Sequence, residues 1–454
     1  MEPEPADAAV DVPSPRGEQP EWPEAEEEIE LAYRGPAVSH LLLVQAEPSA
    51  LDVHFNIDTT GSIHLAIDEL QAALRSDIIQ PLRARVPDIA FGVSRFADFP
   101  VPPFGGTGEG DMDPDKPYVL LSPITTDIDR VINAVAKLDR PLDYGADLSE
   151  ASAEALYQVA TGAGFVVGSH RYIERGPKTA AVGGGTVGGV GFRSQALHVV
   201  LHVGDSPSHE PEDYAEGDLP GTRSLEQATS ALREIGARVI SIIPSICEDQ
   251  KTEELREACR TGYPYAPTRQ ELSALAINTG ARTAAERGSC PTGIAQAPLP
   301  AYDGTCPLVY DVRGDGSGLS RTISDAVLAM LEQVRFGEVH AEASNDRLGF
   351  VRELRAEAVR QPSGVAQPEL RDRLPLPPEK PDGVADSFLQ VERRSQLGFR
   401  VTLRNDRIAP SDLPQRFRIA IRVVGDGVLL QERLLRVLVP AGHVTGDDDL
   451  DAGR

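Results

Sequence analysis

The sequence of 454 residues lacks long apolar runs and is poor in basic side chains. It contains no stretch of about 18 consecutive apolar residues, so it has no candidate transmembrane helix. Lys and Arg total 44 against 70 Asp and Glu, which gives a formal net charge of −26. Nucleic acid and anionic membrane surfaces would repel so acidic a chain, and we expect neither as a partner.

The first 30 residues also lack the features of an export signal. They are rich in Pro and Glu, with no basic start and no apolar centre. Two explanations stay open: a signal encoded upstream of Met1, or a cytosolic protein.

Cysteine is scarce, and its four copies are confined to one stretch. Cys247, Cys259, Cys290 and Cys306 lack the short paired spacings of a zinc site. Two disulfides, most simply between sequential cysteines, are the favoured interpretation and imply an oxidising compartment. Four free thiols in a reduced protein remain the alternative.

The pattern of apolar residues divides the chain into four parts. Residues 1–35 are acidic and Pro-rich and are expected to be a disordered arm. Over 36–337, strands alternate with helices, which predicts an α/β domain with a doubly wound, mostly parallel sheet. Short β-like runs over 338–441 predict a β-sandwich, and 442–454 form an acidic tail. Gly183–Gly191 lacks the Lys-Ser/Thr ending of a phosphate loop and is expected to be a flexible connector.

A turn rich in oxygen donors directly follows the predicted strand Leu51–Ile57. Asp58, Thr60 and Ser62 stand there at alternate positions, before a long helical pattern. Carboxylate and hydroxyl oxygens are ligands for Mg²⁺, Mn²⁺ or Ca²⁺. The same residue types also favour a simple helix N-cap, so this segment alone leaves both interpretations open.

Two further predicted strands also end in an aspartate. Asp98 follows Ile89–Phe96, and Asp205 follows Leu197–Val203. Loops at the carboxyl edge of a parallel sheet converge where the strand order reverses, so these side chains are expected to meet Asp58. Crowded carboxylates repel one another, and a divalent cation would relieve that repulsion.

These motifs resemble the von Willebrand factor A (vWA) domain, closest to the I-like domain of integrin beta subunits. Asp58, Thr60 and Ser62 match the family's Asp-x-(Ser/Thr)-x-Ser motif, and Asp205 matches the aspartate after its fourth strand. Glu150, in Asp-Leu-Ser-Glu, looks like the glutamate ligand of the beta-subunit variant. The resemblance implies a Mg²⁺ or Mn²⁺ site, the metal-ion-dependent adhesion site, with these five residues as its ligands.

The resemblance also implies a second ion, Ca²⁺, beside the first. Asp98 and Asp147 stand where its ligands would be, with Glu150 shared. The relatives use an asparagine that Gly145 replaces here, so we expect one ion and at most two. His54 and Asn56 are a further departure, since they place polar side chains in a strand that should be apolar on both faces.

By resemblance, the chain is expected to be a non-enzymatic, adhesion-type protein whose cation accepts an Asp or Glu side chain of a partner protein. An extracellular or cell-envelope location would follow. The strand-like run Ala37–Gln45 raises the hypothesis that the α/β domain is inserted into the sandwich, as in integrins. An intracellular assembly factor for a ring ATPase, such as a metal chelatase, is the runner-up. A metallohydrolase is a third hypothesis, for which the sequence shows no evident nucleophile or base.

Overall fold

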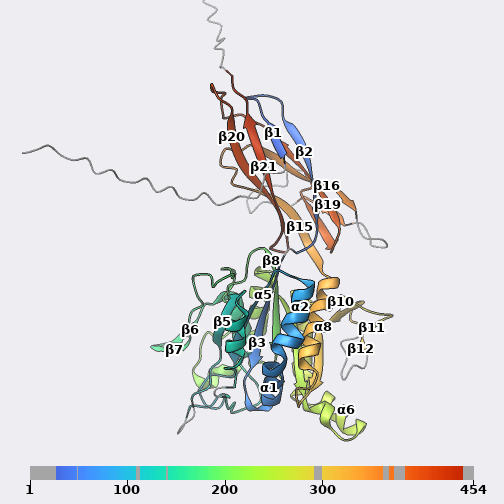
Figure 1. Ribbon diagram of the computed structural model, residues 1–454. Helices are drawn as coiled ribbons and strands as arrows, with labels where there is room; N and C mark the ends of the chain where they lie inside the picture. The colour runs from blue at the N-terminus through green and yellow to red at the C-terminus, as the bar shows by residue number, and fades with distance from the viewer. Residues whose placement is uncertain are drawn as a thin grey trace, which may run out of the picture.

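The computed structural model describes residues 27–48, 50–108, 113–139, 142–290, 299–360, 368–372 and 384–442. They form an α/β domain and a β-sandwich, which lie end to end (Figure 1). Residues 1–26 of the predicted arm, and the predicted tail from residue 443, lie outside the described residues. Across the described part of the chain, no helix is long and apolar enough to cross a membrane.

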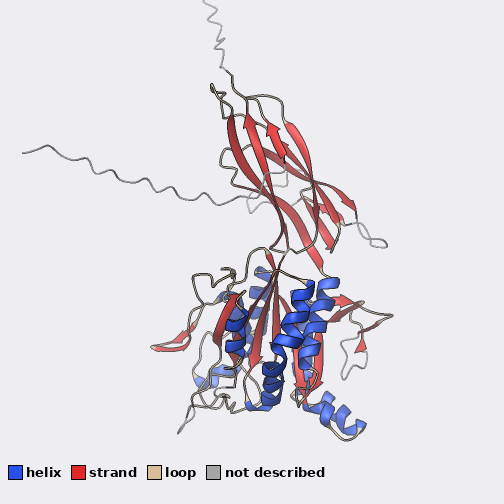
Figure 2. Cartoon of the chain, viewed as in Figure 1, coloured by secondary structure: helices blue, strands red, loops and turns tan. Residues whose placement is uncertain are grey.

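The α/β domain is built on a six-stranded, mostly parallel sheet, which confirms the predicted fold class (Figure 2). Its strand order is β14-β9-β8-β3-β4-β5, and only the edge strand β5 is antiparallel to its neighbour. The strands are β3 (Ala50–Asp58), β4 (Ile89–Phe96), β5 (Val119–Thr125), β8 (Ala196–Val203), β9 (Arg238–Ser245) and β14 (Val309–Arg313). The order reverses between β3 and β8, so the loops after these two strands border the crevice where ligands bind in such sheets.

Helices cover both faces of this sheet (Figure 1). One group packs around α1 and α8, and the other consists of α4, α5 and α7. A π-helical segment, Leu74–Ile79, joins α1 to α2. The helices are α1 (His64–Ala73), α2 (Gln80–Arg85), α3 (Ile128–Val135), α4 (Ser152–Thr161), α5 (Leu225–Glu234), α6 (Glu253–Thr261), α7 (Tyr265–Thr279) and α8 (Leu319–Glu332).

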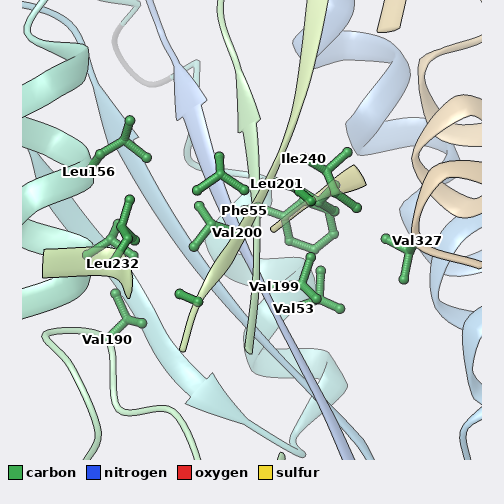
Figure 3. Packing of buried hydrophobic residues seen from close by; sticks show 14 of the residues in the cluster. Val53, Phe55, Leu156, Val190, Val199, Val200, Leu201, Leu232, Ile240 and Val327 are labelled. Atoms are coloured by element: carbon green, nitrogen blue, oxygen red, sulfur yellow. The ribbon is translucent and has the colours of Figure 1, made fainter. Parts of the chain in front are cut away.

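The core lies on both sides of the central strands (Figure 3). Val199 and Leu201 of β8 pack beside Phe55 on one face, whereas Val200 between them faces Leu156 on the other. All five side chains are fully buried. Burial of each contributes about 1.5–3 kcal/mol. This two-sided burial explains the continuous apolar run Val199–Leu201 in β8.

The second domain is a sandwich of two β-sheets. The larger has the order β1-β21-β20-β15-β18-β17, and the smaller β16-β19-β2. The strands are β1 (Glu27–Glu30), β2 (Val38–Gln45), β15 (Arg335–Ser344), β16 (Val351–Arg360), β17 (Glu369–Arg371), β18 (Ser387–Glu392), β19 (Gln396–Leu403), β20 (Gln415–Gly425) and β21 (Val428–Val439).

Two strands that precede the α/β domain belong to this sandwich. β2 pairs with β19 along its whole length, from Gln45 with Gln396 to Val38 with Leu403. β1 pairs in parallel with β21. The α/β domain is therefore inserted between β2 and β15, as the sequence suggested. The domain boundary that the sequence placed at residue 36 is corrected by these pairings, because β2 completes the smaller sheet.

Both cysteine pairs form disulfides between sequential partners, as the favoured interpretation predicted. Cys247 bonds to Cys259 across the start of α6, and Cys290 bonds to Cys306. The second bond ties two small hairpins, β11 (Ser289–Cys290) with β12 (Leu299–Pro300) and β10 (Arg282–Ala284) with β13 (Thr305–Pro307).

The glycine-rich segment is a packed loop instead of the loose connector that its composition suggested. A Cβ on Gly185 would lie 2.1 Å from the Phe192 carbonyl oxygen, and one on Gly189 would lie 2.0 Å from that of Gln158. Glycine is needed there because other backbone segments approach so closely. The remaining hairpin, β6 (Phe165–Val167) with β7 (His170–Ile173), precedes this loop.

Candidate metal centre

The predicted turn after β3 folds around its own aspartate. The Thr60 amide and the Thr60 hydroxyl both donate to Asp58 Oδ1, at 2.9 and 2.8 Å. Thr60 Oγ1 and Ser62 Oγ lie 3.2 Å apart. Asp58 and Thr60 are buried, whereas Ser62 is exposed, so the turn opens to solvent at its Ser62 end.

Asp205 joins this turn from the neighbouring strand. It lies two residues beyond the end of β8, and its Oδ1 accepts a hydrogen bond of 3.1 Å from Ser62 Oγ. A chain of three short polar contacts therefore links the carboxylates of Asp58 and Asp205. The structure thus brings together two predicted ligands that are far apart in sequence.

Glu150 reaches the same cluster on a loop held by backbone hydrogen bonds. Its amide donates to the Pro207 carbonyl at 3.0 Å, and its own carbonyl accepts from the His209 amide at 2.9 Å. Gly145 packs over it, because a Cβ at that position would lie 3.2 Å from Glu150 Oε1 and 3.4 Å from Thr60 Cγ2. Gly145, which replaces the relatives' asparagine, therefore lets its loop pack closely against the side chains of Glu150 and Thr60.

Arg95 and Asp143 stabilise the turn through hydrogen bonds that involve Thr59. Asp143 Oδ2 accepts from Thr59 Oγ1 at 2.5 Å and from Arg95 Nη1 at 2.8 Å. Burial raises the pKa of Asp143 to about 6, although Arg95 and Thr59 act in the opposite direction. The sequence indicated Asp143 only as one carboxylate of the loop that carries Glu150, and it did not indicate Arg95, because their roles depend on which loops meet in space.

The carboxylates of the cluster are buried close together, so their ionised forms repel one another. Burial, together with the charge of Asp205, raises the pKa of Asp58 to about 8. Burial raises the pKa of Glu150 well above its usual value, and Asp58, Asp98 and Asp205 add to the effect. Buried charge of one sign is costly unless a counter-charge is present.

Two buried oxygens of the cluster have no hydrogen-bond partner. They are Asp58 Oδ2 and Glu150 Oε2. Native structures rarely leave a buried carboxylate oxygen unpartnered. A divalent cation, reached directly or through a bound water, would give these oxygens a partner and offset the repulsion, so the residues present fit a metal ion of the hard, oxygen-binding class.

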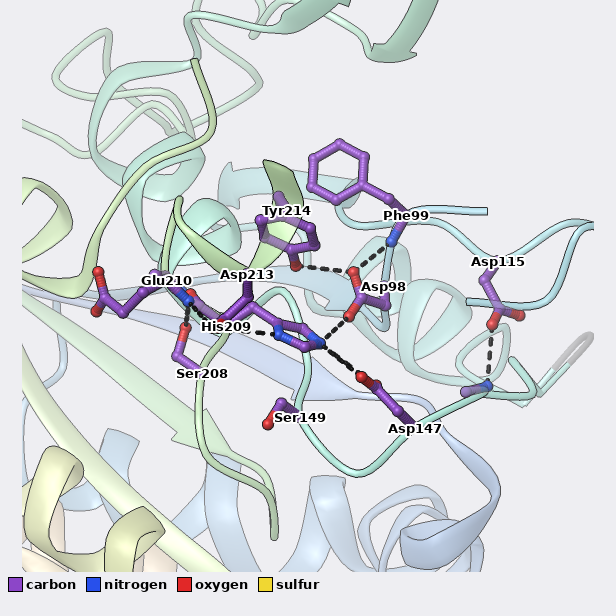
Figure 4. A network of polar contacts seen from close by, with 12 residues as sticks. Asp98, Phe99, Asp115, Asp147, Ser149, Ser208, His209, Glu210, Asp213 and Tyr214 are labelled. Atoms are coloured by element: carbon purple, nitrogen blue, oxygen red, sulfur yellow. Dashed lines mark hydrogen bonds and ion pairs between the residues drawn. The ribbon is translucent and has the colours of Figure 1, made fainter. Parts of the chain in front are cut away.

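A second cluster is centred on His209, a residue that the sequence did not single out (Figure 4). It lies close enough to the first for the charges of Asp98 and Asp147 to act on Glu150. His209 Nε2 is 3.2 Å from Asp98 Oδ2 and 3.2 Å from Asp147 Oδ2. Its Nδ1 is 3.6 Å from Asp213 Oδ2. The atoms of Asp98, Asp147 and His209 are close enough for one ion to be held by all three.

His209 also brings positive charge to this second cluster. Burial lowers its pKa, but the carboxylates of Asp98 and Asp147 outweigh that effect and raise it to about 9. The imidazolium then occupies the space between the two aspartates that were predicted to hold the second ion. The signal in the sequence was the position of His209 in the same loop as Asp205.

The polar residues of β3 find partners inside the sheet. Ser94 Oγ lies 2.8 Å from His54 Nε2 and donates to Asn56 Oδ1 at 2.8 Å. Asn56 Nδ2 lies 3.1 Å from His202 Nδ1. A side chain on Gly92 would clash with His54 Nδ1 at 2.6 Å, so that glycine makes room for the ring. These residues form a buried row across β4, β3 and β8 beneath the candidate metal centre.

Comparisons with known proteins add little beyond this geometry. No family model matches the sequence, and no curated protein matches it. Among solved structures, a von Willebrand factor type A protein from Catenulispora acidiphila is 12% identical over 92% of this chain and 72% of that chain, with a TM-score of 0.33. Proximal thread matrix protein 1 from the mussel byssus is 12% identical over 64% of this chain and 48% of that one, with a TM-score of 0.30.

The pilus adhesin SpaC from Lactobacillus rhamnosus GG is 8% identical, covers 84% of this chain and 43% of that one, and gives a TM-score of 0.33. This chain therefore spans less than half of the length of the byssus protein and of the adhesin. Scores so low carry no argument on function. The doubly wound sheet and the convergence of Asp58, Glu150 and Asp205 at its strand-order reversal agree with the resemblance in the sequence. The architecture of the α/β domain is therefore the doubly wound, mostly parallel sheet that the sequence predicted.

Proposed function

We propose that this chain is a metal-dependent binding protein whose cation accepts an acidic side chain of a partner protein. The observation that carries the proposal is the pair of buried, unpartnered oxygens on Asp58 and Glu150. They belong to a cluster that opens to solvent at Ser62. A cation there would be reachable by a group from another molecule.

The chemistry of the residues favours Mg²⁺ or Mn²⁺. Thr60, Ser62 and Glu150 would hold the ion directly, and Asp58 and Asp205 would act through water. The hydroxyls of Thr60 and Ser62 supply oxygen without charge, so a carboxylate from a partner would complete the site well. A Ca²⁺ ion at the adjacent site would be held by the carboxylates of Asp98 and Asp147, with Glu150 shared, and would have to displace the His209 ring from between them.

A binding role is favoured over hydrolysis by the state of His209. Both of its ring nitrogens face carboxylates, those of Asp98 and Asp147 on one side and that of Asp213 on the other. An imidazole so engaged is poorly placed to take a proton from a nucleophile. We therefore propose that the chain is not an enzyme.

The two disulfides favour an extracellular or cell-envelope location over the cytosolic assembly factor. Titration of thiols in the native protein distinguishes the two proposals. We expect no reactive thiol before reduction and four after it, one for each cysteine of the two bonds. Four thiols in the native protein would favour the assembly factor.

The metal site is tested by calorimetric titration with Mg²⁺ and Mn²⁺. We expect binding by the unaltered chain and none by Asp58→Ala. Asp129→Ala is the matched control, since the Asp129 side chain is 81% exposed and pairs with the exposed Arg75. Absence of heat at about 10 mM metal, above the weakest dissociation constants typical of extracellular sites, would refute the proposal.

A further inference from the structure

Three large side chains stand exposed around the candidate metal centre. Tyr144 is 71% exposed, Leu148 57% and Tyr263 61%. We call these three residues the rim. Single exposed apolar residues are common on proteins, so exposure alone says little. Their position relative to the predicted ligands is more informative.

Each rim residue lies near a proposed ligand in sequence or through a neighbouring residue. Tyr144 directly precedes Gly145, which packs on Glu150 and Thr60. Leu148 lies two residues before Glu150. The Tyr263 hydroxyl is 3.1 Å from Ser149 Oγ, the residue next to Glu150. A group bound at the cluster would therefore have apolar surface close beside it.

Tyr144 is held in place by its backbone. The two oxygens of Asp115 accept from the amides of Tyr144 and Gly145 at 2.8 and 2.9 Å, and one of them also accepts from Gly106 at 2.6 Å. The Ala146 amide donates to the Phe104 carbonyl at 2.8 Å. The loop is thus ordered by contacts of its own, and a partner would not have to bear the cost of ordering it.

Tyr263 is held by a different set of contacts. It lies between α6, which the Cys247–Cys259 disulfide ties to the end of β9, and α7, which begins at Tyr265. Glu271 of α7 accepts from the Ser208 amide at 2.9 Å, so α7 is fastened to the loop that carries Asp205. Segments distant in sequence therefore hold Tyr144 and Tyr263 near the loop that carries Glu150.

The loops that surround the rim are strongly acidic. Residues 143–154 contain four carboxylates and residues 205–218 contain six, and neither segment contains Lys or Arg. A partner would therefore meet mostly acidic side chains in these two segments, apart from His209 and the bound cation. Electrostatic complementarity then requires basic side chains on the partner outside its acidic residue.

We propose that the rim is a docking surface for a protein segment in which one Asp or Glu is flanked by apolar side chains, with Lys or Arg further out. The inference rests on the proposed metal site and names the chemistry of its partner. The acidic residue reaches the cation, the apolar neighbours pack on Tyr144, Leu148 and Tyr263, and the basic residues face the acidic loops. Aromatic residues in such a position commonly dominate binding energy.

Selection from a random-peptide phage library tests the proposal without a known ligand. Phage are bound to the full chain in MgCl₂ and eluted with EDTA. We expect the enriched peptides to contain an acidic residue beside Leu, Ile, Phe or Tyr, and Lys or Arg outside that pair. Enrichment of acidic peptides without apolar neighbours, or no EDTA-dependent enrichment from a chain that binds Mg²⁺, would overturn the inference and leave the metal site standing.

Variants of the rim supply the second measurement. One enriched peptide, labelled for fluorescence anisotropy, is titrated with Tyr144→Ser and Leu148→Ser. We expect each variant to lose about tenfold in affinity, the effect of losing one well-packed apolar side chain, with unchanged Mg²⁺ binding. Leu413→Ser is the control, because Leu413 is 74% exposed on the sandwich.

Other outcomes of these variants would refute the inference. Equal peptide affinity in all variants, or loss of Mg²⁺ binding together with peptide binding, would show that the rim makes no docking contact of its own. A Mg²⁺-dependent dimer that Leu148→Ser abolishes, seen by size-exclusion chromatography with light scattering, would make the occupant a second copy of this chain. Failure of Mg²⁺ to bind the unaltered chain would instead refute the proposed function.

Discussion

Ser62 donates a hydrogen bond to Asp205 across 143 residues of sequence and so joins the turn after β3 to the loop after β8. The two strands are neighbours at the point where the strand order of the sheet reverses. One hydroxyl therefore fixes the distance between two loops that carry carboxylates. The stability of the metal-free protein should reflect this crowding.

Replacement of Glu150 by Gln should stabilise the protein when metal is absent. The change removes a carboxyl group whose ionised form is disfavoured in the folded protein by burial and by Asp58 and Asp205, and it keeps the size of the side chain. We expect the free energy of unfolding in EDTA to rise by about 1–2 kcal/mol. The gain in stability on adding Mg²⁺ should shrink at the same time.

Urea unfolding with and without Mg²⁺ measures both effects of Glu150→Gln. Glu257→Gln, at a side chain that is 66% exposed, serves as the matched control and should change neither quantity. A loss of stability in EDTA for Glu150→Gln would mean that its carboxylate is already compensated by protein groups.

Replacement of His209 by Gln should destabilise the protein near neutral pH. The Asp98 carboxylate is fully buried and would lose its cationic neighbour. We expect a loss of about 2 kcal/mol, below the value for a fully buried pair because Asp147 is partly exposed. The pKa of His209 is raised to about 9 in the folded protein. Its contribution to the free energy of unfolding is therefore fully present below the pKa of histidine in the unfolded chain, about 6.5, and is lost as pH rises through 9.

The pH dependence provides the test for His209. The difference in stability between the unaltered chain and His209→Gln should be large at pH 6.5 and should fade toward about pH 9.5. Chemical denaturation in EDTA at several pH values measures it. A difference independent of pH would indicate that the ring acts by packing against Phe104 and Tyr214 and not by its charge.

The sequence predicts those structural features that local residue patterns determine, and it does not predict contacts between distant segments. The ends of β3, β4 and β8 are set by runs of apolar residues followed by Asp58, Asp98 and Asp205, so the sequence placed three carboxylates at one sheet edge. His209 was missed because nothing in its neighbourhood states that Asp98 lies opposite, 111 residues away. That contact is chosen by the tertiary structure.

The same distinction applies to the sandwich. The strand pattern of β19 is visible in the sequence, since Phe399, Val401 and Leu403 alternate with Arg400 and Thr402. β15 was missed because Arg335–Ser344 mixes charged and small residues on a strand with neighbours on both sides. β1 was assigned to a disordered arm, because four residues of mostly acidic sequence show no strand pattern until β21 pairs with them.

Acid should destabilise the protein through the histidines buried in its sheet. Burial lowers the pKa of His54 to about 3 and that of His202 to about 4. Because both histidines have the ordinary pKa of about 6.5 in the unfolded chain, the protein takes up protons when it unfolds below pH 6.5. Each histidine should then cost about 1.4 kcal/mol for every pH unit, down to its own folded pKa.

Comparison of variants isolates this effect from the many carboxylates. His202→Gln should unfold with a shallower loss of stability between pH 6.5 and 4.5 than the unaltered chain, measured by urea unfolding in EDTA. His170→Gln, at an exposed ring on β7, should leave the slope unchanged. Equal slopes in all three proteins would contradict the prediction.

Asp426 should control how firmly the two domains are joined. It lies in the turn between β20 and β21, where its carboxylate accepts from the amides of Gly337 and Glu338 at 2.9 and 3.0 Å. It also pairs at 3.4 Å with Arg238, the first residue of β9 in the α/β domain. The Asp426 carboxylate thus connects the β20–β21 turn of the sandwich to β15, which follows the α/β domain, and to β9 in the sheet of the α/β domain.

Asp426→Asn keeps the shape of the side chain and suits the left-handed backbone of this position, where φ is 48°. It removes the charge that compensates buried Arg238, so we expect a loss of about 1–2 kcal/mol in the free energy of unfolding. Because the Leu429 amide still donates to the Ser194 carbonyl at 3.1 Å, the domains should stay attached but vary more in their relative orientation. Small-angle X-ray scattering should then show a larger radius of gyration. Asp406→Asn, at a turn whose arginine partners lie within the sandwich, should leave that radius unchanged, and an identical radius for Asp426→Asn would show that the domains are held by other contacts.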